Sequence, residues 1–275
     1  MDQSTKRELA LKAAQVRLNI LEAVHAASSG HPGGSLSIAE VITYLYNKEM
    51  KVDPKNPKWA DRDRLVLSKG HCAPALYAIL AEQGFFPREE LAKLRQVDSF
   101  LQGHPDMKHT PGVDMTTGSL GLGISAACGM ALAAKIDGKD YRTYTILGDG
   151  ETEEGQVWEA AMFAAHYKLD NLCVIVDWNG LQIDGPIAEV MNPAPHDKKF
   201  EAFGFHVISI DAHDFDQIEA ALAEARTVKG KPTAIIMTSV KGKGVSFMEN
   251  QCGWHGSAPN DEQYAQAVAE IKATM

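Results

Sequence analysis

The chain has 275 residues, which is long enough for one large α/β domain with a substantial core. Asp and Glu outnumber Lys and Arg by 36 to 27, so the formal charge is −9, and no long basic run occurs. This balance argues against nucleic-acid binding. It also means that an anionic ligand must be held by local groups, because the overall field of the protein repels it.

The N-terminal segment and the cysteines indicate where the protein works. The first residues are polar and lack the apolar stretch of a signal peptide. No segment approaches the roughly 18 apolar residues that a membrane span needs. The four cysteines lie far apart and form no C-x-x-C pair, so we expect buried free thiols in a cytoplasmic protein and no zinc site. They are Cys72, Cys128, Cys173 and Cys252.

In the first half of the chain, apolar spacing predicts helices separated by loops rich in glycine and proline. We expect helices at residues 4–27 and 37–46, a loop at 50–62, a strand at 64–67, a helix at 88–97, an irregular site-forming loop at 99–115 and a small-residue helix at 119–135. The Ser68-Lys69-Gly70 run after the strand suggests a turn of the kind that binds phosphate.

The second half alternates between continuous apolar runs and helical patterns. Strands are expected at 143–147, 172–176, 205–210 and 233–238, and helices at 154–167, 215–227 and 261–273. This alternation predicts an α/β fold with a doubly wound, mainly parallel sheet and helices on both faces. In such sheets ligands bind beyond the carboxyl ends of the strands. Residues that directly follow each strand are therefore the functional candidates.

Two glycine-containing loops follow neighbouring predicted strands. One reads Gly148-Asp149-Gly150, and the other runs from Asp177 through Asn179 to Leu181. Carboxylate, amide and carbonyl oxygens suit a hard divalent cation, and glycines let the backbone approach a phosphate. A metal bridging the protein and a diphosphate would explain how an acidic chain binds an anion. Each loop alone is more often a plain tight turn.

Histidine is the side chain best suited to proton transfer near neutral pH. Four of the ten histidines lie in loops that contain glycine: His31 in S-S-G-H-P-G-G, His71 in S-K-G-H-C, His104 in Q-G-H-P-D, and His255 in G-W-H-G-S. Taken singly, each is more often a loop residue with a satisfied hydrogen bond. The other six histidines lack such a context, and we interpret them as structural or surface residues.

Together these motifs resemble the transketolase family of thiamine-diphosphate enzymes. The resemblance lies in the runs G-D-G-E-T-E-E-G and I-V-D-W-N-G-L and in the order of the four histidine motifs. It implies thiamine diphosphate and Mg²⁺ (or Ca²⁺ or Mn²⁺) as cofactors. The metal would be bound by Asp149, Asn179 and the carbonyl of Leu181, with Gly150 at the diphosphate. Trp178 stands where many members have Asp or Asn, at a position not expected to bind the metal.

The same resemblance implies roles for the histidines. His31 and His104 would contact substrate hydroxyls, and His71 and His255 would lie between substrate and diphosphate, with His71 near the developing alkoxide. All four are therefore catalytic candidates, and His71 and His255 are also cofactor-binding candidates.

A third segment resembles the family's T-G-x-L-G-x-G run. By that match Gly118, Ser119 and Leu120 would lie along the cofactor, although a glycine-rich helix start is the plainer interpretation. Ser119 replaces the commoner proline. Glu154 opens a helix, where a carboxylate complements the dipole. The resemblance implies that it also reaches the paired chain and couples to the cofactor-activating glutamate.

The resemblance covers only the first of the three domains of a full-length transketolase. We therefore expect residues 1–275 to form a single diphosphate-binding domain. The activating glutamate, and the Arg and Ser groups that hold the sugar phosphate, would lie in pyrimidine-binding and C-terminal domains elsewhere. We favour a natural partner chain, a C-terminal transketolase subunit, over a truncation. The expected assembly has two copies of each chain.

The expected function is transfer of a two-carbon glycolaldehyde unit from a ketose phosphate to an aldose phosphate. A split transketolase acting on a sulfo-sugar is the nearest alternative, because the phosphate-binding groups are expected on the partner. The histidine order argues against a deoxyxylulose-phosphate synthase. A non-catalytic module would have no reason to keep the whole set. A dinucleotide-binding fold is excluded because Gly118, Gly121 and Gly123 follow no predicted strand and do not fit the G-x-G-x-x-G spacing.

Overall fold

The computed structural model describes residues 1–275 and is built on a five-stranded parallel sheet. The strand order is β1-β2-β3-β7-β6, and every neighbouring pair is parallel. The strands are β1 (Arg64–Leu67), β2 (Thr143–Gly148), β3 (Leu172–Trp178), β6 (His206–Asp211) and β7 (Thr233–Thr238). This arrangement confirms the predicted α/β fold with a parallel sheet.

Both faces of the sheet are buried, because successive strand side chains point in opposite directions. In β3, Cys173 and Ile175 join one apolar core, and Val174 and Val176 join the other. The larger core lies under α1 (Gln3–Ala27), α3 (Ala39–Tyr44), α4 (Ala73–Glu82), α9 (Phe215–Thr227) and α10 (Asp261–Lys272). The smaller core lies under α5 (Gly123–Ile136), α6 (Gly155–His166) and α8 (His196–Ala202).

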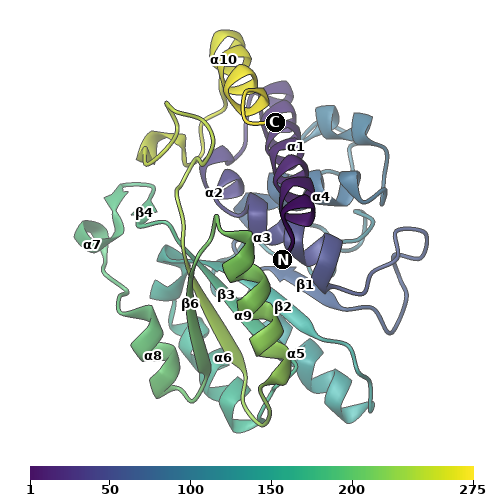
Figure 1. Ribbon diagram of the computed structural model, residues 1–275, viewed down its shortest axis with the longest axis vertical. Helices are drawn as coiled ribbons and strands as arrows, with labels where there is room; N and C mark the ends of the chain where they lie inside the picture. Colours follow the sequence, from purple (N-terminus) through teal and green to yellow (C-terminus); the bar gives the residue numbers. More distant parts are fainter.

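The remaining elements are short. They are α2 (Pro32–Leu36), the π-helical turn η1 (Leu45–Glu49), the 3-10 turns η2 (Gly70–Cys72), η3 (Arg88–Lys93), η4 (Gly150–Glu153) and η5 (Cys252–Trp254), the hairpin β4 (Leu181–Gln182) and β5 (Gly185–Pro186), and α7 (Ile187–Val190). Figure 1 shows the first and last helices, α1 and α10, side by side. No helix of the structure combines the length and the apolar character that crossing a bilayer requires.

Most predicted elements agree with the structure within two residues. Two predicted helices differ in kind or in their first residue, and α2, α4, α7, α8 and the β4–β5 hairpin are not predicted. Helix α4 is not predicted, because nearly all of its residues are buried and it shows no amphipathic period. Helix α2 is missed because it is only five residues long and contains two glycines. The helix predicted at 88–97 is only a 3-10 turn, η3. The small-residue helix begins at Gly123, four residues later than predicted, because residues 119–122 form a turn.

Candidate functional site

The candidate site is a cavity of about 330 Å³ at the carboxyl edge of the sheet. Its walls come from the loops that follow the neighbouring strands β1, β2, β3 and β7 and from segments near residues 31–34 and 255. Nine of the twelve residues predicted from the sequence line this cavity: His31, His71, Gly118, Leu120, Asp149, Gly150, Asn179, Leu181 and His255. The parallel sheet therefore brings together motifs that lie far apart in the sequence.

Asp149 joins the two loops that are expected to bind a metal. Its carboxylate accepts hydrogen bonds from the backbone N–H of Gly150 at 2.8 Å and of Gly180 at 2.6 Å. In the second loop, the backbone N–H of Leu181 donates to Oδ1 of Asn179 at 3.1 Å. Burial, together with the nearby Asp177, raises the pKa of Asp149 to about 6. The carboxylate is thus fixed in place and largely withdrawn from water.

A buried ion pair underlies the second loop. Lys69 Nζ lies 2.6 Å from Oδ2 of Asp177, and both side chains are almost fully buried. The same Oδ2 accepts hydrogen bonds from Ser37 at 2.7 Å and from the amide of Asn179 at 3.1 Å, and the hydroxyl of Ser239 donates to Oδ1. Because the amide nitrogen of Asn179 donates to Asp177, the amide oxygen Oδ1 of Asn179 points away from Asp177.

Glu151 holds the Asp149 turn against the segment around Gly121. Its carboxylate accepts from the backbone N–H of Gly121 at 2.9 Å and of Gly148 at 3.0 Å, and from the hydroxyl of Ser68. Burial raises the pKa of Glu151 above its ordinary value. Three loops of the site are therefore joined through one buried side chain.

The four predicted histidines form one cluster. The ring of His31 lies 5.2 Å from that of His71, 5.5 Å from that of His255 and 6.5 Å from that of His104, measured between centroids. His71 and His255 are stacked, with their centroids 5.0 Å apart. These residues come from opposite ends of the sequence, and their proximity is a product of the fold.

The environment of the cluster keeps the imidazoles uncharged near neutral pH. Burial, followed by the charge of Arg95, lowers the pKa of His31 to about 4. Burial and Lys241 lower the pKa of His255 to about 3, and burial also lowers the pKa values of His71 and His104. A neutral imidazole both donates and accepts a hydrogen bond, which is what the hydroxyl groups of a sugar require.

Lys241 connects the histidine cluster to the predicted metal site. Its Nζ lies 3.0 Å from the carbonyl oxygen of Leu181 and 3.0 Å from Nδ1 of His255. Burial lowers the pKa of Lys241. In its ammonium form Lys241 only donates, so Nδ1 of His255 accepts and the neutral ring carries its proton on Nε2. Lys241 therefore selects the tautomer of His255.

Three predicted residues lie outside the cavity lining: His104, Ser119 and Glu154. His104 packs against Gly118, where a Cβ would lie 3.2 Å from the imidazole Cδ2. Ser119 lies in the turn before α5, and Glu154 caps α6 beside Gly121, where a Cβ would lie 2.7 Å from that of Glu154. Their predicted contacts with substrate, cofactor or partner stay predictions.

Several lining residues are not predicted from the sequence: Gly34, Lys69, Gly148, Glu151, Gln182, Ile183, Asp184 and Lys241. The rule that functional groups directly follow strands points to Lys69 after β1 and Lys241 after β7. Glu151 offers no comparable signal, because its role depends on contacts with Ser68 and Gly121 from distant parts of the chain.

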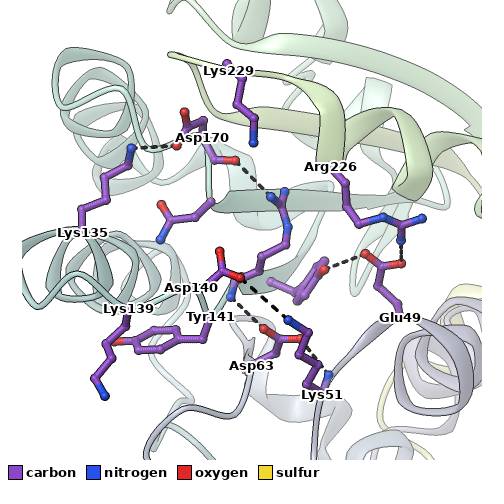
Figure 2. A pocket seen from close by; sticks show the side chains of 13 residues that line it. Glu49, Lys51, Asp63, Lys135, Lys139, Asp140, Tyr141, Asp170, Arg226 and Lys229 are labelled. Atoms are coloured by element: carbon purple, nitrogen blue, oxygen red, sulfur yellow. Dashed lines mark hydrogen bonds and ion pairs between the residues drawn. The ribbon is translucent and has the colours of Figure 1, made fainter.

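A second cavity, of about 400 Å³, lies at the opposite, amino-terminal edge of the sheet and is strongly charged. Figure 2 shows that its charges pair with each other, through Lys135 with Asp170, Arg226 with Glu49, and Lys51 with Asp140. None of the predicted site residues line it. We therefore place the functional site at the carboxyl edge.

The comparisons with known proteins agree with this fold and site. The family model described as the thiamine diphosphate binding domain of transketolase matches residues 9–273. The chain is 50% identical over 257 residues to the 6-deoxy-6-sulfo-D-fructose transketolase subunit of Clostridium sp. MSTE9, and the match covers 94% of each chain. It is 43% identical to an apulose-4-phosphate transketolase subunit of Phocaeicola vulgatus, covering 96% of this chain and 93% of the other.

Full-length enzymes match only in part. The crystal structure of transketolase from Campylobacter jejuni superposes with a TM-score of 0.91 at 35% identity, covering 96% of this chain and 43% of that one. Rat transketolase is 43% identical, and the chain likewise spans 43% of its length. Fold and site thus define a thiamine-diphosphate-binding domain. The chain belongs to the transketolase family, as a counterpart of its N-terminal domain.

Proposed function

We propose that this chain is the diphosphate-binding subunit of a two-chain transketolase, which transfers a two-carbon glycolaldehyde unit from a ketose phosphate to an aldose phosphate. The observation that carries the proposal is the cluster of His31, His71 and His255 in the cavity that Asp149 and Asn179 also line. Two relatives of similar length, at 50% and 43% identity, are named as transketolase subunits.

The residues present fit thiamine diphosphate with a divalent metal. Asp149, Asn179 and the carbonyl of Leu181 supply three oxygen donors from two adjoining loops, the chemistry that Mg²⁺ or Ca²⁺ prefers. No three His, Cys, Asp or Glu side chains gather in a metal-binding geometry. The cavity volume lies at the lower end of the range for cofactor sites.

The residues of this chain have separate roles in the proposed reaction. When bound, thiamine diphosphate supplies the electron sink for the two-carbon unit. His31 and His104 bind and orient substrate hydroxyls. His71 and His255 exchange protons with the oxygen on the carbon that reacts, with the Nε2 proton of His255 held in place by Lys241. Gly118, Ser119 and Leu120 lie along the cofactor, and Glu154 contacts the partner.

The partner chain completes the enzyme in this proposal. It carries the pyrimidine-binding and C-terminal domains, and with them the activating glutamate, and the assembly contains two copies of each chain. The subunit names of the two relatives support a partner, and the 43% coverage of full-length transketolases is the size expected for one domain of three.

The donor sugar is the open part of the proposal. The relative that is 50% identical is named for a sulfonated ketose, 6-deoxy-6-sulfo-D-fructose. This identity favours a split transketolase for a sulfo-sugar as the second candidate. Phosphate and sulfonate are both compact oxyanions, so the fold and the histidine cluster serve either substrate.

The test combines this chain with a C-terminal transketolase subunit from the same organism. We expect cofactor binding and ketose-to-aldose transfer by the mixture, and we expect Asp149→Ala to weaken metal-dependent cofactor binding at least about 100-fold. Asp184→Ala, at another carboxylate of the cavity, is the matched control. A panel of phosphorylated and sulfonated ketoses identifies the donor.

Two outcomes would contradict the proposal. Turnover by this chain alone would sink the two-chain assignment. Cofactor binding that is unchanged by Asp149→Ala would sink the assignment of the metal site.

A further inference from the structure

His213 lies two residues past the end of β6, outside the cavity, and has no role in the function proposed above. Its side chain is 14% exposed and connects two other segments of the chain. Nδ1 lies 3.1 Å from Oε2 of Glu40, and Nε2 accepts a hydrogen bond from the backbone N–H of Val240 at 3.0 Å. Both ring nitrogens therefore have a partner, which fixes the position and the orientation of the ring.

These contacts also fix the tautomer of His213. A backbone N–H only donates, so Nε2 accepts, and the ring proton lies on Nδ1 and faces Glu40. Burial acts to raise the pKa of Glu40, but the charge of Arg17 and the hydrogen bond from His213 lower it to about 2. Nη2 of Arg17 lies 2.7 and 2.6 Å from the two carboxylate oxygens. A chain of buried contacts thus runs from α1 through α3 to the ring of His213.

Val240 is the point at which the chain leaves the sheet. Strand β7 ends at Thr238, and the N–H of Ser239 still donates to the carbonyl of Trp178 on β3 at 3.0 Å. The next N–H, that of Val240, donates to the ring of His213 and not to a neighbouring strand. The side chain of His213 therefore continues the hydrogen bonding of the sheet beyond the last strand residue.

The residues on either side of Val240 reach into the site. The hydroxyl of Ser239 donates to the buried carboxylate of Asp177. On the other side, Nζ of Lys241 lies 3.0 Å from Nδ1 of His255. The backbone amide between these two side chains is therefore an anchor that sets where both of them point.

We propose that His213 is a positioning residue, which holds the backbone amide of Val240 and thereby places Lys241 against His255. It contacts neither the predicted substrate site nor the predicted cofactor site directly, and acts through the ring proton of His255. The inference goes beyond the proposed function, because it gives a role to a buried network outside the cavity. Only the kinetic part of its test rests on that function.

The direct test is NMR of the chain with isotopically labelled histidine nitrogens, which distinguishes a ring protonated on Nε2 from one protonated on Nδ1. The signals of His255 are identified by their loss in His255→Asn. In the unmodified chain at neutral pH we expect His255 to carry its proton on Nε2 alone. His213→Asn can still donate to Glu40, but its shorter amide does not reach Val240. In this variant we expect a mixture of the two His255 tautomers.

Two further variants separate positioning from a general loss of stability. His213→Gln places an amide oxygen close to the position of Nε2, so it should restore the single tautomer of His255. His206→Asn is the matched control. His206 lies at the opposite end of the same strand, with Nε2 2.6 Å from Glu224, and its replacement should leave His255 unchanged.

Kinetics of the complex with the C-terminal subunit give the functional consequence. His213→Asn should lower kcat for ketose-to-aldose transfer roughly 10- to 100-fold, because the proton of His255 is no longer held in place. The donor KM should stay within about threefold, since no residue that contacts the sugar is replaced. His213→Gln should recover most of the lost kcat.

A ring of His255 protonated on Nδ1 in the unmodified chain would overturn the inference without any variant. A single Nε2-protonated tautomer that persists in His213→Asn would also overturn it, as would an equal disturbance of His255 by His206→Asn. Absence of transfer by the unmodified complex would overturn the proposed function instead. The NMR measurement on this chain would then still decide the role of His213.

Discussion

At the scale of single residues, the buried ion pair of Lys69 and Asp177 is the contact of the site whose loss should cost the most stability. Lys69→Met leaves Asp177 charged and buried beside two hydroxyls and one amide. Breaking such a pair from one side costs about 3–5 kcal/mol. We expect a loss of that order in the free energy of unfolding, measured by urea denaturation of the chain.

The control for this prediction is an exposed ion pair. Lys6 lies 2.6 Å from Asp216 with both side chains partly in water, so Lys6→Met should cost less than about 1 kcal/mol. Similar losses for the two variants would show that burial does not set the energy of the Lys69 pair.

His196 makes the stability of the folded chain depend on pH, and the burial of its ring sets the direction of that dependence. Burial lowers its pKa to about 4, and Nε2 lies 3.1 Å from the Thr152 hydroxyl. Between pH 6.5 and 4 the unfolded chain binds the proton and the folded chain does not, so stability falls as the pH is lowered through this window. The loss from this residue is about 3 kcal/mol at pH 4.

His196→Gln isolates that contribution, because glutamine does not titrate. We expect the difference in unfolding free energy between the unmodified chain and His196→Gln to change by about 3 kcal/mol between about pH 7 and about pH 4. A difference that does not vary with pH would contradict the prediction.

At the scale of elements, helix α5 contains two glycines whose replacement by alanine should change the stability in opposite directions. A Cβ at Gly123 would lie 2.5 Å from the hydroxyl oxygen of Ser68, whereas at Gly129 it would meet nothing within 4 Å. Gly123→Ala should destabilise the chain by about 1–3 kcal/mol through overpacking. Gly129→Ala should stabilise it by about 0.5–1 kcal/mol, because alanine favours the helix. Thermal unfolding of both variants tests this pair, and a shift of the same sign in both would contradict it.

The elements also show what sequence patterns can predict. The strands follow from their continuous apolar runs, and the residues after them lead to Asp149 and Asn179. Helix α4 has no polar face and so gives no periodic signal. Lys69, Glu151 and Asp177 cannot be assigned their roles from the sequence, because those roles consist of buried contacts between distant loops.

At the scale of the whole molecule, several exposed apolar side chains lie on α6 and at the ends of α5, two helices that pack against each other. Met162, Phe163 and Tyr167 are exposed on or just after α6, and Leu122 and Ile136 flank α5. A contiguous exposed apolar patch, unlike a single exposed apolar residue, marks a site of association. Glu154, which is expected to reach the partner, caps the same α6 helix. We therefore expect the C-terminal subunit to cover this face.

Met162→Glu tests that expectation, since its side chain is 60% exposed and a charge there leaves the fold intact. The variant should bind the C-terminal subunit at least about tenfold more weakly while its thermal unfolding stays unchanged. Met275→Glu is the control, because residue 275 follows α10, which Figure 1 places at the far end of the molecule from α6. Assembly that Met162→Glu does not weaken would place the interface elsewhere.

The histidine cluster also has a consequence for folding. His31 and His255 lie 5.5 Å apart in space but come from opposite ends of the sequence, and the backbone N–H of Gly242 donates to the carbonyl of Gly33 between the same two regions. Contacts of such long range are slow to form, because a large loop must close first. We therefore expect the cavity to be completed late in folding, so that ligand binding reports that the whole domain has reached its native topology.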